Sequence, residues 1–234
     1  MTQSVPVKVG GFETSPDGMP QPPRMNPKLV LATHNPGKVK ELREILQAQL
    51  GPTALSDDAL GSCADFGLEA PAEDGATFAE NALIKARAVC RATGLPAVAD
   101  DSGLSVDIMG GAPGIFSARW CGHHGDDAAN LNLLLGQLGE NTDPAQRKAA
   151  FVCAAALVLP DGSEQVEVAE MRGTLITEPR GTGGFGYDPI FVPDDAIANG
   201  RTSAELSPSE KNAISHRGKA FRQLAPTILR TLGE

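Results

Sequence analysis

Two adjacent carboxylates, Asp100 and Asp101, are the residues of this sequence best suited to chemistry. They follow a short apolar run at residues 97–99, which is typical of a buried strand, and lead into Ser102 and Gly103. Carboxylates at the end of a strand commonly hold a divalent cation or activate water. Because successive side chains of a strand point to opposite faces, we expect one aspartate to act in the site and the other to support the scaffold. The alternative is an acidic turn with a Ser-Gly corner.

A candidate anion site lies at residues 33–38, where the apolar run 29–32 leads directly into Thr-His-Asn-Pro-Gly-Lys. Asn35 suits the N-cap of a helix, and Pro36 suits its first position, where the missing N–H costs nothing. Unpaired N–H groups and the helix dipole attract anions at a helix start, and Lys38 adds a positive charge. The spacing is not that of a Walker A motif, so an ordinary helix start remains the alternative.

Other acidic residues and two histidines are further candidate metal ligands. Thr77 and Glu80 have the spacing of a capping box, which explains Glu80 structurally. Glu73 has no such explanation, so it is either a metal ligand or part of a solvated acidic turn. His123 and His124 are adjacent in a glycine loop and lack the i, i+4 spacing of two imidazoles on one ion, so we expect no zinc site there.

A glycine-rich segment at residues 180–189 contains Phe185 and Tyr187 among four glycines. Glycines let a backbone approach a ligand closely, and an aromatic ring in such a loop can stack on a nucleobase. A flexible surface turn is the alternative.

A basic segment follows near the C-terminus. Ser207 begins a capping box that predicts a helix bearing Lys211, continuing through Ser215, His216 and Arg217. Lys211 and Ser215 are i, i+4 neighbours in that helix, and Lys211, Ser215 and Arg217 could reach a common opening. Taken alone, such a basic face is often only solvated.

The elements that position these residues form one pattern of strands alternating with helices, then a hairpin. In the first part of the chain we expect a strand at 29–32, a helix to about residue 50, a mostly irregular stretch at 51–75 with a short strand near 66–68, and a helix from Phe78. In the second part we expect a hairpin of strands 148–159 and 165–176 and a strand at 190–192. The chain should end in a helix at 221–232 that kinks or restarts at Pro226. Antiparallel strands added to parallel strand–helix units make a mixed sheet. We therefore predict an α/β fold in a single domain at residues 28–234, with residues 1–27 as a flexible Pro/Gly-rich leader.

The composition excludes several classes of function. The net charge of −9 argues against broad binding to nucleic acid or an anionic membrane. No apolar run is long enough to span a membrane, and there is no signal-peptide core. The four cysteines have no CxxC spacing, so we expect reduced thiols in a cytoplasmic protein.

Several segments, taken together, closely resemble the noncanonical purine nucleoside triphosphate pyrophosphatases, also called the inosine triphosphatase or Ham1 family. They are THNPGKVKE at 33–41, TFAENA at 77–82, ADDSGL at 99–104, GGAPGIFSAR at 110–119, GGFGYDP at 183–189 and SHRG at 215–218. They occur in the family order, and the resemblance covers residues 28–232.

This resemblance implies a long, curved mixed sheet flanked by helices, with two lobes and a central active-site cleft. It implies a homodimer that uses Mg²⁺ to hydrolyse ITP, dITP and XTP to the monophosphate and pyrophosphate. Asp101 matches the catalytic and metal-binding aspartate, and Glu73 matches a second metal position. The substrate-binding residues implied are Thr33, His34, Asn35, Pro36, Gly37 and Lys38 for the triphosphate, Ser102 beside the aspartates, and Phe185, Gly186, Tyr187, Asp188, Lys211, His216 and Arg217 for the nucleoside.

Two other functions remain open at this point. One is a Maf-type nucleotide pyrophosphatase that acts on other modified nucleotides. The His216-Arg217 motif argues against this function. The other is a nucleotide sensor without turnover. The presence of Asp101, Lys38 and Glu73 argues against a sensor.

Overall fold

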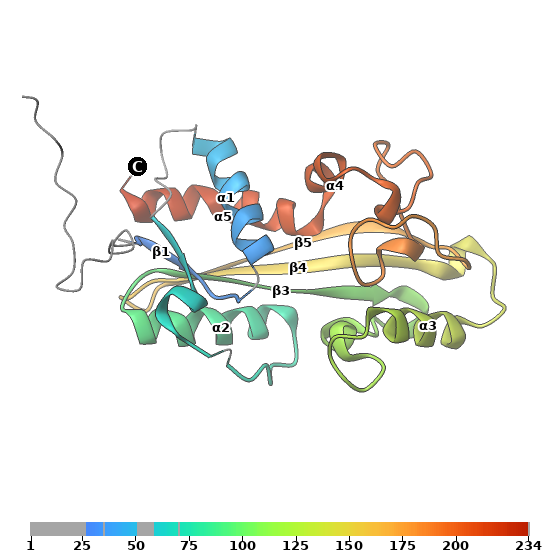
Figure 1. Cartoon of the computed structure of the whole chain (residues 1–234), viewed down its shortest axis with the longest axis horizontal. Coiled ribbons are helices and arrows are strands. Elements are labelled where there is room, and N and C mark those ends of the chain that lie inside the picture. The colour runs from blue at the N-terminus through green and yellow to red at the C-terminus, as the bar shows by residue number, and fades with distance from the viewer. Residues whose placement is uncertain (1–26, 35, 51–58, 70, 234) are drawn as a thin grey trace, which may run out of the picture.

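The fold is built on a six-stranded mixed sheet flanked by helices (Figure 1). The computed structural model describes residues 27–34, 36–50, 59–69 and 71–233. The predicted leader up to residue 26 and Asn35 lie outside the described residues, as does the side chain of Pro36, so the predictions for them stay predictions.

The strand order is β2-β1-β3-β4-β5-β6. The strands are β1 (Leu29–Leu31), β2 (Leu60–Ser62), β3 (Ala97–Val106), β4 (Lys148–Val158), β5 (Glu164–Leu175) and β6 (Phe191–Pro193). The helices are α1 (Pro36–Leu50), α2 (Phe78–Thr93), α3 (Asp127–Leu138), α4 (Pro208–Ile214) and α5 (His216–Leu232). Strand β1 is parallel to β2 and β3, whereas β3, β4, β5 and β6 pair antiparallel in turn. The predicted mixed α/β sheet is confirmed.

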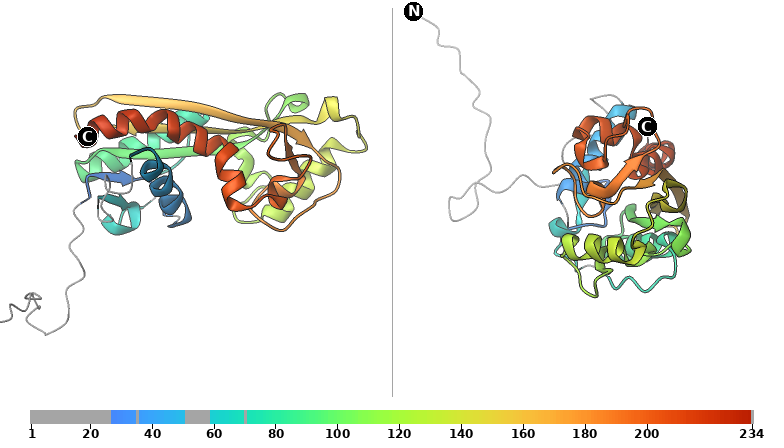
Figure 2. Two further views of the ribbon diagram at one scale, coloured as in Figure 1. Left: turned by 90° about the horizontal axis from the view of Figure 1, so that it is seen from above. Right: turned by 90° about the vertical axis from the view of Figure 1, so that its right-hand side faces the viewer.

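The two faces of the sheet carry different helices. Helices α2 and α3 lie on one face, and α1, α4 and α5 lie on the other (Figure 1). The end-on view shows the sheet between these two helical layers (Figure 2). Under α2, the core is rich in alanine, with Ala82 and Ala86 of the helix against Ala154 and Ala156 of β4. Small side chains allow this helix to pack closely on the strands.

The long hairpin has the sequence signature predicted for it. Strand β4 is almost entirely buried and reads as an apolar run, whereas β5 alternates between buried and exposed residues. At the turn, Gly162 has φ +88°, and Asp161 accepts a hydrogen bond from Ser163 N at 2.8 Å. Both features are typical of a tight connection.

Strand β3 has an open edge beyond its first two residues. Strand β1 pairs with it only at Ala97 and Val98, while β4 pairs with it along its whole length. On the β1 side, the next backbone pairing in the described chain is the bridge from Ser105 to Pro113. Residues 99–104 therefore have no strand partner along this edge in the described chain, and Asp101 and Ser102, from opposite faces of β3, both line one cavity.

Four local predictions are wrong. Asp100 and Asp101 do not end a strand, because β3 continues through them to Val106. The short strand lies at Leu60–Ser62 and not near residues 66–68, because the intervening Cys63–Phe66 forms a 3₁₀ turn. The basic segment is two helices, since Ser215 is extended (φ −61°, ψ 146°) and caps α5 by accepting from Gly218 N. The C-terminal helix neither begins at residue 221 nor restarts at Pro226, which lies inside the continuous α5.

None of the helices described is long and apolar enough to cross a membrane.

Candidate active site

A cavity of about 320 Å³ lies along the open edge of β3. It brings together predicted site residues from five separate segments of the chain. The predicted residues that line it are Lys38, Glu73, Asp101, Ser102, Phe185, Gly186, Tyr187, His216 and Arg217. Of the described residues at 33–38, only Lys38 is part of the wall. Asp188 and Lys211 line a second cavity of about 240 Å³, which shares Phe185, His216 and Arg217 with the first.

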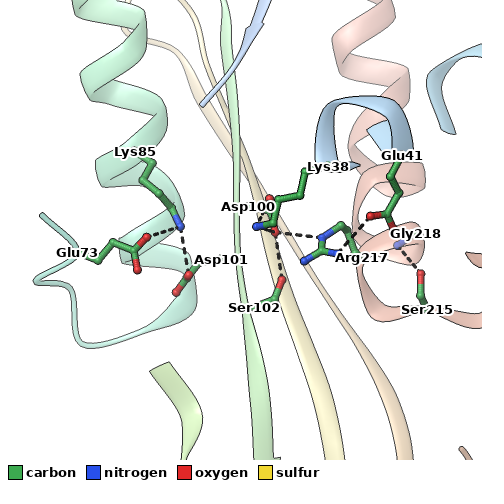
Figure 3. A network of polar contacts seen from close by, with 10 residues as sticks. All are labelled: Lys38, Glu41, Glu73, Lys85, Asp100, Asp101, Ser102, Ser215, Arg217 and Gly218. Carbon is green, nitrogen blue, oxygen red and sulfur yellow. Dashed lines mark hydrogen bonds and ion pairs between the residues drawn. The ribbon is translucent and has the colours of Figure 1, made fainter. Parts of the chain in front are cut away.

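Asp101 lies in an acidic cluster built around the ammonium group of Lys85. Lys85 Nζ donates to Asp101 Oδ1 at 3.2 Å and to Glu73 Oε1 at 2.9 Å (Figure 3). Burial raises the pKa of Asp101, and Glu73 adds to this while Lys85 opposes it. For Lys85, Asp101 and Glu73 outweigh the effect of burial and raise the pKa of the ammonium. The cluster thus combines a carboxylate of raised pKa with a persistently charged lysine.

Asn81 fixes the position of this cluster. Its Nδ2 donates to Asp101 Oδ2 at 3.2 Å, and its Oδ1 accepts from Gly75 N at 2.9 Å. A Cβ at Gly75 would lie only 2.7 Å from Asn81 Oδ1, so glycine is required for this close approach. One buried amide therefore ties the loop carrying Glu73 to the strand carrying Asp101.

Asp100 lies on the opposite face of β3 and has different partners (Figure 3). Its carboxylate accepts from Lys38 Nζ at 2.9 Å, from Arg217 Nε at 3.1 Å and from Ser102 Oγ at 3.2 Å. Burial alone would raise the pKa of Asp100, but Lys38 and Arg217 hold it well below its usual range. The expected division between the two aspartates is confirmed in their geometry: Asp100 is a buried scaffold carboxylate, and Asp101 faces the cavity.

Arg217 connects three elements through its guanidinium group. Besides Asp100 of β3, it binds Glu41 of α1, with Nη1 3.2 Å from Glu41 Oε2. Burial opposes the charge of Arg217, yet Asp100 and Glu41 raise its pKa further. The side chain that the resemblance assigns to the nucleoside is thus engaged by two carboxylates at the junction of α1, β3 and α5. Its role toward the base stays a prediction.

The glycine-rich loop is held by Asp188. The Asp188 carboxylate accepts from Phe185 N at 2.9 Å and from Lys211 Nζ at 2.5 Å. Gly184 has φ +71°, and a Cβ there would collide with the Asp188 side chain. The ring of Phe185 is 65% exposed, and Lys211 Nζ lies 5.1 Å from its centroid. An exposed aromatic ring on a fixed loop is suited to stacking on a planar group.

His216 and Tyr187 form the deeper wall of the first cavity. The His216 ring stacks on Phe151 with centroids 5.2 Å apart. Burial, Arg217 and Lys211 lower the pKa of His216 well below its usual value, so the ring is neutral at pH 7. Tyr187 is buried and donates from its hydroxyl to Ser117 O at 2.9 Å, and burial raises its pKa. These two rings give the cavity a rigid, uncharged side.

Three residues of the site were not singled out from the sequence. Lys85 and Asn81 are i, i+4 neighbours on the otherwise apolar face of α2, and a lysine on such a face is a signal that could have identified them. Glu41 lies on α1, and its pairing with Arg217, 176 residues away, has no local sequence signal.

The Asp101–Glu73 pair fits a divalent cation. The oxygens of both carboxylates converge on one point, which the Lys85 ammonium occupies as a stand-in cation. Mg²⁺ favours one or two carboxylates together with phosphate oxygens and water, which is the donor set this pair supplies. Within the described segments, no group of three or more His, Cys, Asp or Glu side chains is arranged to bind a metal.

Comparisons with known sequences give one consistent result. A sequence model of the Ham1 family matches residues 29–227. A Streptomyces avermitilis protein named dITP/XTP pyrophosphatase is 58% identical over 206 residues, covering 88% of this chain and 99% of that protein. A Corynebacterium diphtheriae protein of the same name is 50% identical over 203 residues, covering 86% and 96%.

Solved structures agree with the sequence comparison. The HAM1 protein of Coxiella burnetii has a TM-score of 0.76 and 39% identity, covering 87% of this chain and 99% of its own. A nucleoside-triphosphatase, also titled dITP/XTP pyrophosphatase, from Mycobacterium abscessus has a TM-score of 0.69 and 48% identity, covering 85% and 98%.

Proposed function

This chain belongs to the Ham1 family, and we propose that it hydrolyses dITP, ITP and XTP to the nucleoside monophosphate and pyrophosphate. The observation that carries the proposal is the pairing of the Asp101–Lys85–Glu73 cluster with Lys38 along one cavity wall. Carboxylates suited to a metal ion and lysines suited to phosphates are the minimum that phosphoryl transfer requires.

The polyphosphate end of the substrate is assigned to the lysine-rich side of the cavity. Lys38 binds the triphosphate from the start of α1, where helix N–H groups also favour an anion. Lys38 is paired with Asp100, which Arg217 also neutralises, so Asp100 would keep a cation when Lys38 turns toward phosphate. Thr33, His34, Asn35 and Gly37 are assigned to the same end by the family resemblance.

Asp101 is assigned as the general base toward the attacking water. Its raised pKa makes it a better proton acceptor than an ordinary carboxylate, while Lys85 keeps it ionised at neutral pH. Asp101 and Glu73 would hold Mg²⁺, which neutralises charge on the phosphate oxygens when bound. Attack at the α-phosphorus leaves pyrophosphate as a single leaving group.

The nucleoside end is assigned to the loop 184–188 and the start of α5. Phe185 provides a stacking surface, while Ser102, Gly186 and Tyr187 complete the path between the two ends. Hypoxanthine and xanthine present an acceptor at position 6, where adenine presents a donor. Donors from His216 or Arg217 would be left unpaired against adenine, a mismatch that discriminates strongly.

A substrate panel tests the proposal. The chain is incubated with ITP, dITP, XTP, GTP, ATP and dTTP with Mg²⁺, and pyrophosphate and orthophosphate are measured separately. Pyrophosphate release from ITP, dITP and XTP, in preference to GTP and ATP, is expected. Preference for dTTP or another modified pyrimidine would favour the Maf-type alternative, and tight ITP binding without release would favour the sensor.

Assembly and location are part of the same proposal. We infer a homodimer from the family resemblance, to be tested by light scattering of the eluted protein. All four cysteines are free thiols, which supports a reducing, cytoplasmic environment.

A further inference from the structure

The second cavity shares Phe185 with the first cavity, and Asp101 is not part of its wall. It is walled by the start of α4, by the loop at Gly183–Gly184, and by the 3₁₀ turn Ser203–Glu205. It joins the first cavity at Phe185, His216 and Arg217. A substrate whose polyphosphate lies beside Asp101 can therefore extend its other end into this space.

Two polar atoms around this cavity have no hydrogen-bond partner. Ser203 Oγ and His216 Nδ1 are both fully buried, and no atom of the described residues bonds to either. Ser203 is only 1% exposed, and both residues line the cavity. Buried polar groups in native proteins are nearly always paired, so two unpaired groups at one cavity indicate a missing partner.

The 3₁₀ turn that carries Ser203 is held rigidly. Thr202 N donates to Glu205 Oε2 at 2.7 Å, and Thr202 Oγ1 donates to Arg180 O at 2.8 Å. Gly183 N donates to Ala204 O at 3.0 Å, which fixes the turn against the glycine-rich loop. The position of Ser203 is therefore set by its neighbours, as expected of a residue that reads a ligand.

The chemistry of the unpaired atoms suits the edge of a purine. A serine hydroxyl both donates and accepts, and a neutral histidine does either according to its tautomer. The neighbouring Phe185 offers a ring face, with the Lys211 ammonium on it. A planar heterocycle with polar exocyclic groups satisfies both features at once.

We infer that Ser203 is a specificity-determining residue whose hydroxyl hydrogen bonds an exocyclic group of the purine base. This inference rests on the proposed function and extends it, since neither sequence motif nor family resemblance pointed to Ser203. The hydroxyl contributes to substrate choice by binding bases that carry a polar exocyclic group more tightly than bases that lack one.

Ser203→Ala tests this assignment against three triphosphates. ITP and XTP carry one and two exocyclic oxygens, and purine riboside triphosphate carries none. We expect kcat/KM for ITP, XTP or both to fall about three- to tenfold, with purine riboside triphosphate unchanged. A larger loss with XTP places the contact at position 2, and equal losses with ITP and XTP place it at position 6. Equal loss with all three triphosphates, or no loss with any, would overturn the inference.

The melting temperature distinguishes a role of Ser203 in base recognition from a role in supporting the fold. Since the hydroxyl is unpaired in the free protein, Ser203→Ala should leave Tm unchanged or raise it. A lower Tm would show that Ser203 supports the fold and would contradict the assignment. Ser209→Ala, which removes an exposed hydroxyl on α4, is the matched control and should change neither Tm nor the substrate ratios.

The wild-type chain separates this inference from the proposed function. If it releases no pyrophosphate from ITP, the proposed function fails. If it does so and Ser203→Ala keeps the wild-type substrate ratios, only the assignment of Ser203 fails.

Discussion

Asp100 and Asp101 are neighbours in the chain, yet each is held by a different lysine on a different face of β3. Asp100 lies 2.9 Å from Lys38 Nζ, and Asp101 lies 3.2 Å from Lys85 Nζ. Only an edge without a neighbouring strand allows both faces to border one cavity, and β1 ends early enough to leave that edge open. The division of roles between the aspartates leads directly to the first prediction.

Asp101→Asn should lower the catalytic rate, whereas Asp100→Asn should lower the stability of the fold. Asp101→Asn keeps the shape but removes the general base, so kcat should fall about 10²- to 10⁴-fold with Tm nearly unchanged. Asp100→Asn leaves Arg217 and Lys38 without their buried counter-charge, at a cost of about 3–5 kcal/mol in unfolding free energy. Steady-state kinetics below the melting transition, with calorimetry, measure both. Equal losses of kcat would refute the division.

The stabilising effect of Asp100 should depend on pH in one direction. Its folded-state pKa is depressed, so the stabilisation is fully present above the unfolded pKa of about 3.9 and is lost as pH falls toward the folded pKa. The difference in unfolding free energy between wild type and Asp100→Asn should be constant from about pH 7 to pH 5 and shrink below about pH 4. Urea titrations across this range test it, and a difference that grows on acidification would contradict the sign.

Lys85→Met should shift the pH dependence of catalysis. Lys85 lowers the pKa of Asp101, whereas Glu73 raises it. Without the lysine, the acidic limb of the kcat/KM profile should move to higher pH, and turnover at pH 7 should fall. Lys40→Met is the matched control because Lys40 is exposed on α1. An unmoved acidic limb would show that Asp101 is not the base.

Lys38→Ala and Arg217→Ala should separate phosphate binding from base selection. Lys38→Ala should lower kcat/KM for ITP, XTP and GTP by one common factor, since every substrate carries the triphosphate. Arg217→Ala should lower kcat/KM for ITP more than kcat/KM for ATP, by about ten- to a hundredfold in the ratio, for a lost charge-assisted hydrogen bond to the acceptor at position 6.

Ratios between substrates measured on one variant do not depend on how much of it is folded. This matters because Arg217→Ala also removes two ion pairs. A common factor for all nucleotides would assign Arg217 to the scaffold that links Glu41 and Asp100.

The sequence predicted most of the fold because the determinants are local. The hairpin, the N-caps Thr77 and Ser207, and the alternation at Asp100 and Asp101 each depend on neighbours within a few residues. The short strand at 60–62 was misplaced because it has few residues and is specified by pairing with β1 rather than by its own pattern.

The site was predictable in part for the same reason. Motifs placed Asp101, Lys38 and Phe185, but Lys85 and Glu41 owe their roles to contacts between distant segments. Ser215 ends α4 and begins α5, but the sequence pattern across it is that of one continuous helix, so this break was not predicted.

Isotope labelling is the most direct test of the central claim that water attacks the α-phosphorus of the substrate. ITP is hydrolysed by the wild-type chain in ¹⁸O-water with Mg²⁺, and both products are analysed by mass spectrometry. The label should appear in IMP and not in pyrophosphate. Label in pyrophosphate, or release of labelled orthophosphate, would show attack at another phosphorus and contradict the account.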